Sequence, residues 1–285
     1  MIRFLLLVAI VLGFALPAES LDLKASTVWT NLTWASSRQA DTAGETFSGS
    51  DLYGNGSLLL TQKLKNDFAL SSGWVGDPIQ RGRIFLKLGY SQENFSVSLS
   101  PFVGTLTTPQ TWFNPGMSLR LQTTKPGLGF IGAGFLTTFA PVANNGDAYT
   151  SGMHAEVGMY LEHGILTFSV ENKAFLTDTN GVFVKDSQTR YLFDTEVFEK
   201  NIPFRFAVDL GYQTLSRTYT APAVTSTQID SCLFGGKLSW VTSPRSSVFV
   251  KALVSLFSLG EGAAIYGVPS STALFELEAG FTYQE

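Results

Sequence analysis

The charged side chains are the groups of this chain that could do chemistry, and many of them recur at every second position. The chain of 285 residues ends in ALFELEAGFTYQE, in which Glu276 and Glu278 alternate with apolar residues. The segment FRFAVDLGYQ places Arg205 and Asp209 in the same way. Successive side chains of a β-strand point to opposite faces, so the charges lie on one face and the apolar groups on the other. Such a charged face could contact ions or polar solutes.

Residues that could serve in catalysis or metal binding are few. The chain has two histidines and one cysteine. His163 falls in a predicted tight turn and His154 on the charged face of a predicted strand, so the two form neither a metal pair nor a catalytic dyad. A phospholipase would need a serine–histidine pair on the apolar face, which His154 does not occupy. We therefore expect no enzymatic activity and no cofactor, and we expect Cys232 to act as a small apolar residue.

The N-terminus has the pattern of a secretory signal peptide. Arg3 precedes an apolar run over residues 4–14, and small residues follow at Ala18 and Ser20. The run is shorter than the roughly 20 apolar residues that a membrane helix needs. We therefore predict a signal peptide over residues 1–20 that is removed on export.

The remaining chain, residues 21–285, is predicted to form one β-rich domain. Only 15% of the residues are charged, 13% are aromatic and 27 are glycine, which is typical of an ordered β-protein. The net charge of −4 excludes the basic surface of a nucleic-acid-binding protein. A single cysteine excludes a disulfide framework.

Period-two alternation predicts fourteen strands. Twelve strands are the alternative, because weak segments can be misread and boundaries can shift by about 2–4 residues. The fourteen segments are residues 22–34, 54–64, 67–75, 82–91, 95–105, 116–124, 128–139, 150–161, 165–176, 189–198, 204–215, 228–241, 247–257 and 272–283.

The connections between these segments alternate between short and long. Short ones such as residues 65–67 and 162–164 carry the Asn, Asp, Gly and Pro of tight hairpins, and longer ones such as residues 35–53 and 140–149 fall between them. Greek-key crossovers in a soluble sandwich would mix these lengths. The alternation therefore predicts an all-β transmembrane antiparallel up-and-down β-barrel, with short periplasmic turns and longer extracellular loops. Closure is required because an open strand edge leaves backbone groups unsatisfied in lipid.

Aromatic residues are predicted to mark the two membrane interfaces. Their positions fall beside the tight turns or beside the long loops, as in the two aromatic girdles of a membrane barrel. The turn-side group is Phe68, Tyr90, Phe95, Phe204, Phe206, Trp240, Phe281 and Tyr283, and the loop-side group is Trp34, Trp74, Trp112, Phe139 and Tyr212.

The charged residues opposite the apolar face are predicted to line the lumen. A basic wall from the earlier strands could face a partly acidic wall from the later ones and produce a field across the lumen. Alternatively, neighbours such as Lys251 and Glu276 balance charge between adjacent strands. The predicted pore-lining residues are Lys63, Lys87, Arg120, Glu156, Glu171, Asp194, Glu196, Arg205, Asp209, Lys237, Lys251, Glu276 and Glu278.

Together, the signal peptide, the hairpin rhythm and the aromatic last strand resemble a bacterial outer-membrane β-barrel porin. In size and strand count the chain is similar to the monomeric fourteen-stranded OmpG-type porins. The resemblance implies passive diffusion of small polar solutes, a monomer, and contact with outer-membrane lipid, lipopolysaccharide-like glycolipid and the barrel-assembly machinery. It places the protein in the outer membrane of a bacterium with two membranes. Gln284 and Glu285 follow Tyr283 where such families end on an aromatic residue, which points away from a proteobacterial lineage.

Two other functions fit the same fold. The loops could bind a host component or another ligand, with the barrel as their support. A transporter of apolar molecules similar to the FadL type would need an apolar lumenal patch, for which Phe85, Phe102, Phe198 and Phe249 are inward candidates. FadL-type proteins carry an N-terminal plug, whereas here the first strand follows the cleavage site closely, so an unplugged lumen is expected. Loop 35–53 could fold inward and narrow it.

Overall fold

The computed structural model describes residues 20–37, 46–77, 79–80, 82–106, 111–139, 147–179, 182–199, 202–220, 224–259 and 274–284. The predicted signal peptide lies outside these residues except for Ser20, with which the first strand begins. The side chains at some strand ends and in most long loops also lie outside the described part. No helix in the described ranges is long and apolar enough to cross a membrane.

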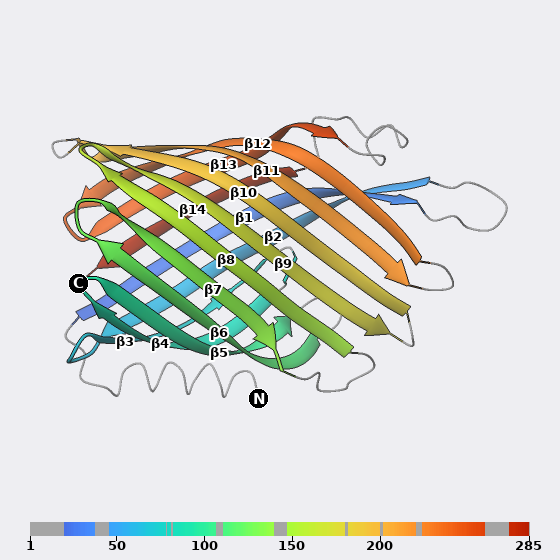
Figure 1. The fold of residues 1–285 in the computed structure, drawn as a ribbon, viewed down its shortest axis with the longest axis horizontal. Helices are drawn as coiled ribbons and strands as arrows, with labels where there is room; N and C mark the ends of the chain where they lie inside the picture. Colours follow the sequence, from blue (N-terminus) through green and yellow to red (C-terminus); the bar gives the residue numbers. More distant parts are fainter. Residues whose placement is uncertain are drawn as a thin grey trace.

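Fourteen antiparallel strands form one closed barrel, which confirms the predicted fold and strand count (Figure 1). Each strand pairs with its neighbours in sequence, and β1 pairs with β14 to close the ring, so the sheet has no free edge. The strands are β1 (Ser20–Ser37), β2 (Thr46–Lys63), β3 (Phe68–Val75), β4 (Gly82–Gln92), β5 (Phe95–Leu106), β6 (Thr111–Lys125), β7 (Gly129–Thr138), β8 (Asp147–Leu161), β9 (Gly164–Thr179), β10 (Val182–Phe198), β11 (Phe204–Thr220), β12 (Val224–Ser243), β13 (Ser246–Leu259) and β14 (Leu274–Gln284).

Several strands extend further toward the long loops than the alternation predicts. The predicted loop 177–188 is mostly strand, because β9 continues to Thr179 and β10 begins at Val182. The predicted loop 219–227 is shortened in the same way by β11 and β12. The sequences of these tips, TDTNGVFVKDSQ and YTAPAVTST, lack the apolar alternation that identifies a strand. Backbone pairing holds them in the sheet regardless, as Phe183 opposite Thr220 shows.

The outer face of the barrel is apolar, as predicted. Large apolar side chains such as Ile131, Phe206 and Val250 are more than half exposed on the face opposite the charged residues. In a soluble protein such a continuous exposed surface would be unstable, whereas lipid covers it in a membrane. On the turn side, Phe204 stacks on Trp240 with ring centroids 5.9 Å apart. Of the predicted loop-side girdle, Phe139 and Tyr212 are exposed, while the side chains of Trp34 and Trp112 lie outside the described part.

The apolar band ends where polar side chains begin to pair on the outer face. Asn172 on β9 donates a hydrogen bond to Thr189 on β10 at 2.8 Å, and Thr214 on β11 donates one to Asp230 on β12 at 2.7 Å. On β11 the apolar band runs from Phe204 to Tyr212. At about 3.3 Å per residue and a tilt of roughly 35–45°, this length spans about 20–25 Å, close to the apolar height of an outer-membrane barrel.

Candidate functional site

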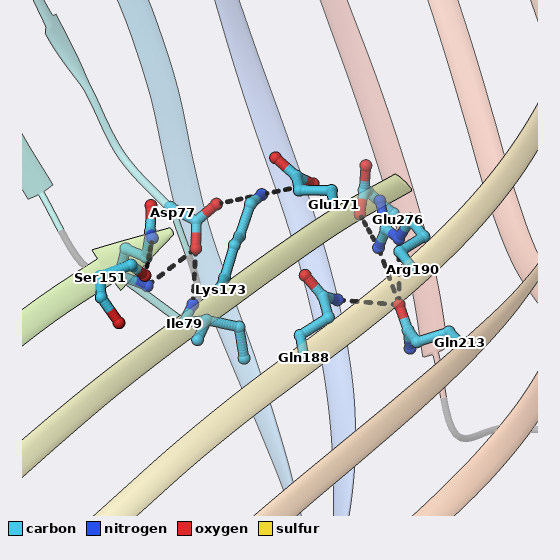
Figure 2. A network of polar contacts seen from close by, with 10 residues as sticks. Asp77, Ile79, Ser151, Glu171, Lys173, Gln188, Arg190, Gln213 and Glu276 are labelled. Carbon is cyan, nitrogen blue, oxygen red and sulfur yellow. Dashed lines mark hydrogen bonds and ion pairs between the residues drawn. The ribbon is translucent and has the colours of Figure 1, made fainter. Parts of the chain in front are cut away.

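The connection between β3 and β4, which lies at the loop end of the barrel, reaches across the lumen. Ile79 in this connection is fully buried, and the Gln80 side-chain amide donates a hydrogen bond to the backbone carbonyl of Ser151 at 2.6 Å. Ser151 lies on β8, and four strands separate β3 from β8 around the ring. Asp77 and Gln80 therefore contact the wall that lies across the barrel from β3 and β4 (Figure 2).

Asp77 fixes both the shape and the position of this connection. One carboxylate oxygen accepts hydrogen bonds from the backbone amides of Ile79 and Gln80, each at 2.8 Å, and so closes a tight turn. The other oxygen accepts a hydrogen bond from the Lys173 ammonium on β9 at 2.7 Å. Lys173 also contacts Glu171 at 3.0 Å, so the ammonium lies between two carboxylates (Figure 2).

Asp77 remains ionised over the physiological pH range. Burial disfavours its charged form, but the Lys173 ammonium and the hydrogen bonds outweigh that effect and lower the pKa of Asp77 to about 2. Because this pKa lies below the ordinary value, the contribution of Asp77 to folding stability is present above pH ~4 and is lost as the pH falls through about 2.

Gly152 on β8 leaves the space that the Gln80 amide occupies. A Cβ atom at Gly152 would lie 2.7 Å from Nε2 of Gln80. We predict that Gly152→Val pushes Gln80 away and undocks the connection. A cysteine placed at Ile79, in a Cys232→Ala background, should then react with a small water-soluble thiol reagent faster than it does with Gly152 intact. Gly236→Val, on the outer face, is the matched control and should leave the rate unchanged; equal rates in all three proteins would contradict the docked position of Gln80.

A second set of polar contacts crosses the lumen beside the first. Arg190 on β10 contacts Glu276 on β14 at 3.3 Å, although three strands separate β10 from β14. The Arg190 guanidinium also donates two hydrogen bonds to the side-chain oxygen Oε1 of Gln213, at 3.1 and 3.0 Å. Gln188 donates to the same oxygen at 2.8 Å, and both glutamines are buried (Figure 2). A network of charged and polar groups of this kind holds the strands that it joins at fixed distances across the lumen.

An apolar cluster lies against the connection inside the barrel. Its members are 3% exposed or less, and Leu192 packs against them. The strand alternation turns the strand members inward, so they project into the lumen. Together with Asp77, Ile79 and Gln80 they narrow the lumen, which the sequence predicts to be unplugged. The sequence predicts that loop 35–53 could narrow the lumen, and residues 38–45 of this loop lie outside the described residues. The cluster consists of Ile79, Ala148, Phe175, Leu215, Leu233 and Leu253.

The register places all thirteen predicted pore-lining residues on the inward face. They alternate with the exposed apolar side chains along each strand, but whether solutes contact them stays a prediction. Many carry an ion-pair partner on the same, an adjacent or a next-adjacent strand. This supports local charge balance more than two opposed charged walls. The local pairs are Lys63–Asp22, Arg120–Glu156, Lys173–Glu171, Arg205–Glu196 and Lys251–Asp209.

Two of the pairings differ from the sequence-based expectation. Lys251 contacts Asp209 at 3.0 Å, two strands away, and Glu276 contacts Arg190. Arg120 on β6 reaches Glu156 on β8 because Gly132 on β7 leaves the space between them, where a Cβ would lie 2.6 Å from the carboxylate of Glu156. Which charges meet therefore depends on the small residues between them.

Sequence reasoning missed three charged residues of this lumenal network. Arg83 and Arg190 lie on the inward face with Lys87 and Asp194, so the same alternation could have identified them. Asp77 lies outside any strand, and its only signal is an Asp–Pro pair within a connection that also carries an isolated apolar residue. That signal predicts a turn but does not indicate whether the turn points into the lumen.

Comparison with known proteins supports the fold. No family model matches the sequence, and no curated protein matches it. The structure is similar to an outer membrane channel from Pseudomonas putida F1, with 11% identity and a TM-score of 0.50 over 95% of this chain and 97% of that one. A porin and a mutant of the TodX monoaromatic hydrocarbon channel follow at 9% identity, with TM-scores of 0.44 and 0.43. They cover 93% and 96% of this chain, and 99% and 92% of their own chains.

Proposed function

We propose that this chain is an outer-membrane channel through which small hydrophilic solutes diffuse passively. The observation that supports this most directly is the difference in polarity between the outer and inner faces of the closed barrel. Large apolar side chains are exposed outside, and ion-paired charges line the inside. Only lipid stabilises the first face, and only water or polar solutes stabilise the second. The barrel would act as a monomer among outer-membrane lipids and glycolipids, after insertion by the barrel-assembly machinery.

Exposed charged side chains in the turn-side half of the lumen support such a channel. The inward side chains of Lys63, Arg120 and Arg205 are 53–56% exposed, although their charges are paired. Surface-like pairs of this kind contribute at most about 1 kcal/mol each, because water screens them. They would let small ions and polar molecules pass between them. The constriction formed by Asp77, Ile79 and Gln80 would then limit the size of the solute.

Conductance across a planar bilayer tests the proposal. The refolded mature chain should produce discrete current steps, and the charge reversals Lys87→Glu and Asp194→Lys should shift the reversal potential in a salt gradient in opposite directions. Arg245→Gln, in the exposed turn before β13, is the matched control and should leave ion selectivity unchanged. Correct folding is checked by the heat-dependent shift in gel mobility that closed barrels show. A folded protein that never conducts would overturn the proposal.

Transport of apolar molecules is a second candidate, because the structure contains the apolar lumenal patch that such a protein needs. The patch is the cluster around Phe175, Leu215 and Leu253. A fluorescent apolar probe should bind the folded barrel, and Phe175→Ser should weaken its binding. Loop-mediated binding of a host component has no comparable support, since residues 38–45, 140–146 and 260–273 lie outside the described part.

A further inference from the structure

The Asp77 carboxylate lies against cationic side chains of the lumenal wall. Asp77 itself belongs to the β3–β4 connection and not to a strand of that wall. The cations around it belong to the wall: Lys173 lies on β9 and Arg83 on β4. The charges of Asp77 and Arg83 also act on each other. One cation of the barrel, Lys173, thus forms an ion pair with a carboxylate on a short tether, and the charge of a second cation, Arg83, acts on that carboxylate.

The side chain of Arg83 has hydrogen-bonding capacity that its surroundings leave unused. Within the described residues, its Nε and Nη1 atoms are buried and have no hydrogen-bond partner. The guanidinium lies over the ring of Phe102, 5.6 Å from its centroid, and Gly104 leaves the space that Cγ of Arg83 occupies. The Nε and Nη1 atoms of Arg83 lie on different edges of the guanidinium, and each can donate a hydrogen bond to a carboxylate oxygen. Leaving buried donors unpaired is unfavourable, so a further acceptor at this point would be bound favourably.

The charge balance of the network points to the same class of ligand. Among the described residues, three cations and three anions interact in it, so their charges balance while Asp77 is docked. If Asp77 undocks, the five residues that remain in the partly buried wall carry one uncompensated positive charge. A single anion restores neutrality, whereas a cation or a neutral solute does not. The six residues are Arg83, Lys173, Arg190, Asp77, Glu171 and Glu276.

We propose that Arg83 and Lys173 form a binding site for small carboxylate solutes, which Asp77 occupies when the lumen is closed. The inference rests on the proposed channel function and names its substrate class. A carboxylate solute displaces Asp77, the connection undocks, and the solute itself neutralises the wall. A tethered group on a short flexible linker acts at an effective concentration of about millimolar or above, so displacement needs solute at a comparable concentration.

Thiol labelling tests the proposal without depending on conductance. Cysteine is placed at Ile79 in a Cys232→Ala background, and its reaction with a small thiol reagent is measured in sodium acetate, sodium chloride and acetamide, the two salts at equal ionic strength. We expect acetate to raise the rate at least about fivefold over chloride, the lower range of ligand coupling energies. Acetamide, the neutral isostere of acetate, should have no effect.

Two substitutions distinguish acetate binding at this site from a general loosening of the barrel by the salt. Asp77→Asn keeps the size of the side chain and an oxygen for the turn but loses the charge, so labelling should be fast without acetate. Arg83→Gln should reduce the acetate effect, and Arg245→Gln should retain it. Lys173 keeps Glu171 as a partner in the Asp77 variant, so the barrel is expected to fold.

The outcomes for the site and for the channel are distinguishable. Equal labelling in acetate and chloride, together with fast labelling of the Asp77→Asn protein, would overturn the carboxylate site while leaving the channel intact. A full acetate effect in the Arg83→Gln protein would overturn it as well. A barrel with the expected labelling but no conductance would instead refute the channel function.

Discussion

Phe168→Arg is expected to destabilise the barrel in lipid by about 2–4 kcal/mol, the cost of a basic side chain near the membrane midplane. Phe168 is on the outer face of β9, exposed between Val157 on β8 and Phe193 on β10. Its arginine replacement has no water or carboxylate within the apolar band and must extend toward an interface. The free energy of unfolding is measured by urea titration of the protein in lipid vesicles, with tryptophan fluorescence as the signal.

The neighbouring position provides the matched control. Ser169 points inward and lies opposite Glu156, so Ser169→Arg places the same charge beside a carboxylate in the lumen. We expect its free energy of unfolding to stay within about 1 kcal/mol of the original protein, as for other partly hydrated pairs. Equal losses at the two positions would contradict the assignment of the outer face to lipid.

Arg190→Met is expected to lower the free energy of unfolding by about 3–5 kcal/mol, because it removes one partner of a buried pair. The side chains of Arg190 and Glu276 are only 13% and 20% exposed, so water compensates little for the lost partner. Buried Gln213 would lose its donors from Arg190 at the same time. The same urea titration measures the loss.

A double substitution identifies the cause of this loss. Arg190→Met combined with Glu276→Leu removes both charges and should recover much of the stability, since it leaves no uncompensated carboxylate. Arg245→Gln, in an exposed turn, should change the stability by less than about 0.5 kcal/mol. A loss below about 1 kcal/mol for Arg190→Met would show that this pair behaves as an exposed one.

The amino-acid sequence was enough to predict the barrel, its strand number and the outward or inward direction of its side chains. Alternation is a local property: once a segment is a strand, the position of Phe206 fixes the opposite direction of Arg205 and Asp209. The order of short and long connections then predicted the closed antiparallel ring. Strand ends were less predictable, because at tips such as residues 182–188 backbone pairing continues after the apolar alternation stops.

The contacts inside the lumen depend on the closed three-dimensional arrangement of the strands. Asp77 and Lys173 are far apart in sequence, and Arg190 and Glu276 lie on strands that do not pair, so each contact depends on closure, on strand stagger and on the width of the ring. Small residues such as Gly132 and Gly152 set which side chains can meet across an intervening strand. Local periodicity carries no information about these distances, because it fixes the face on which a side chain lies but not what lies opposite.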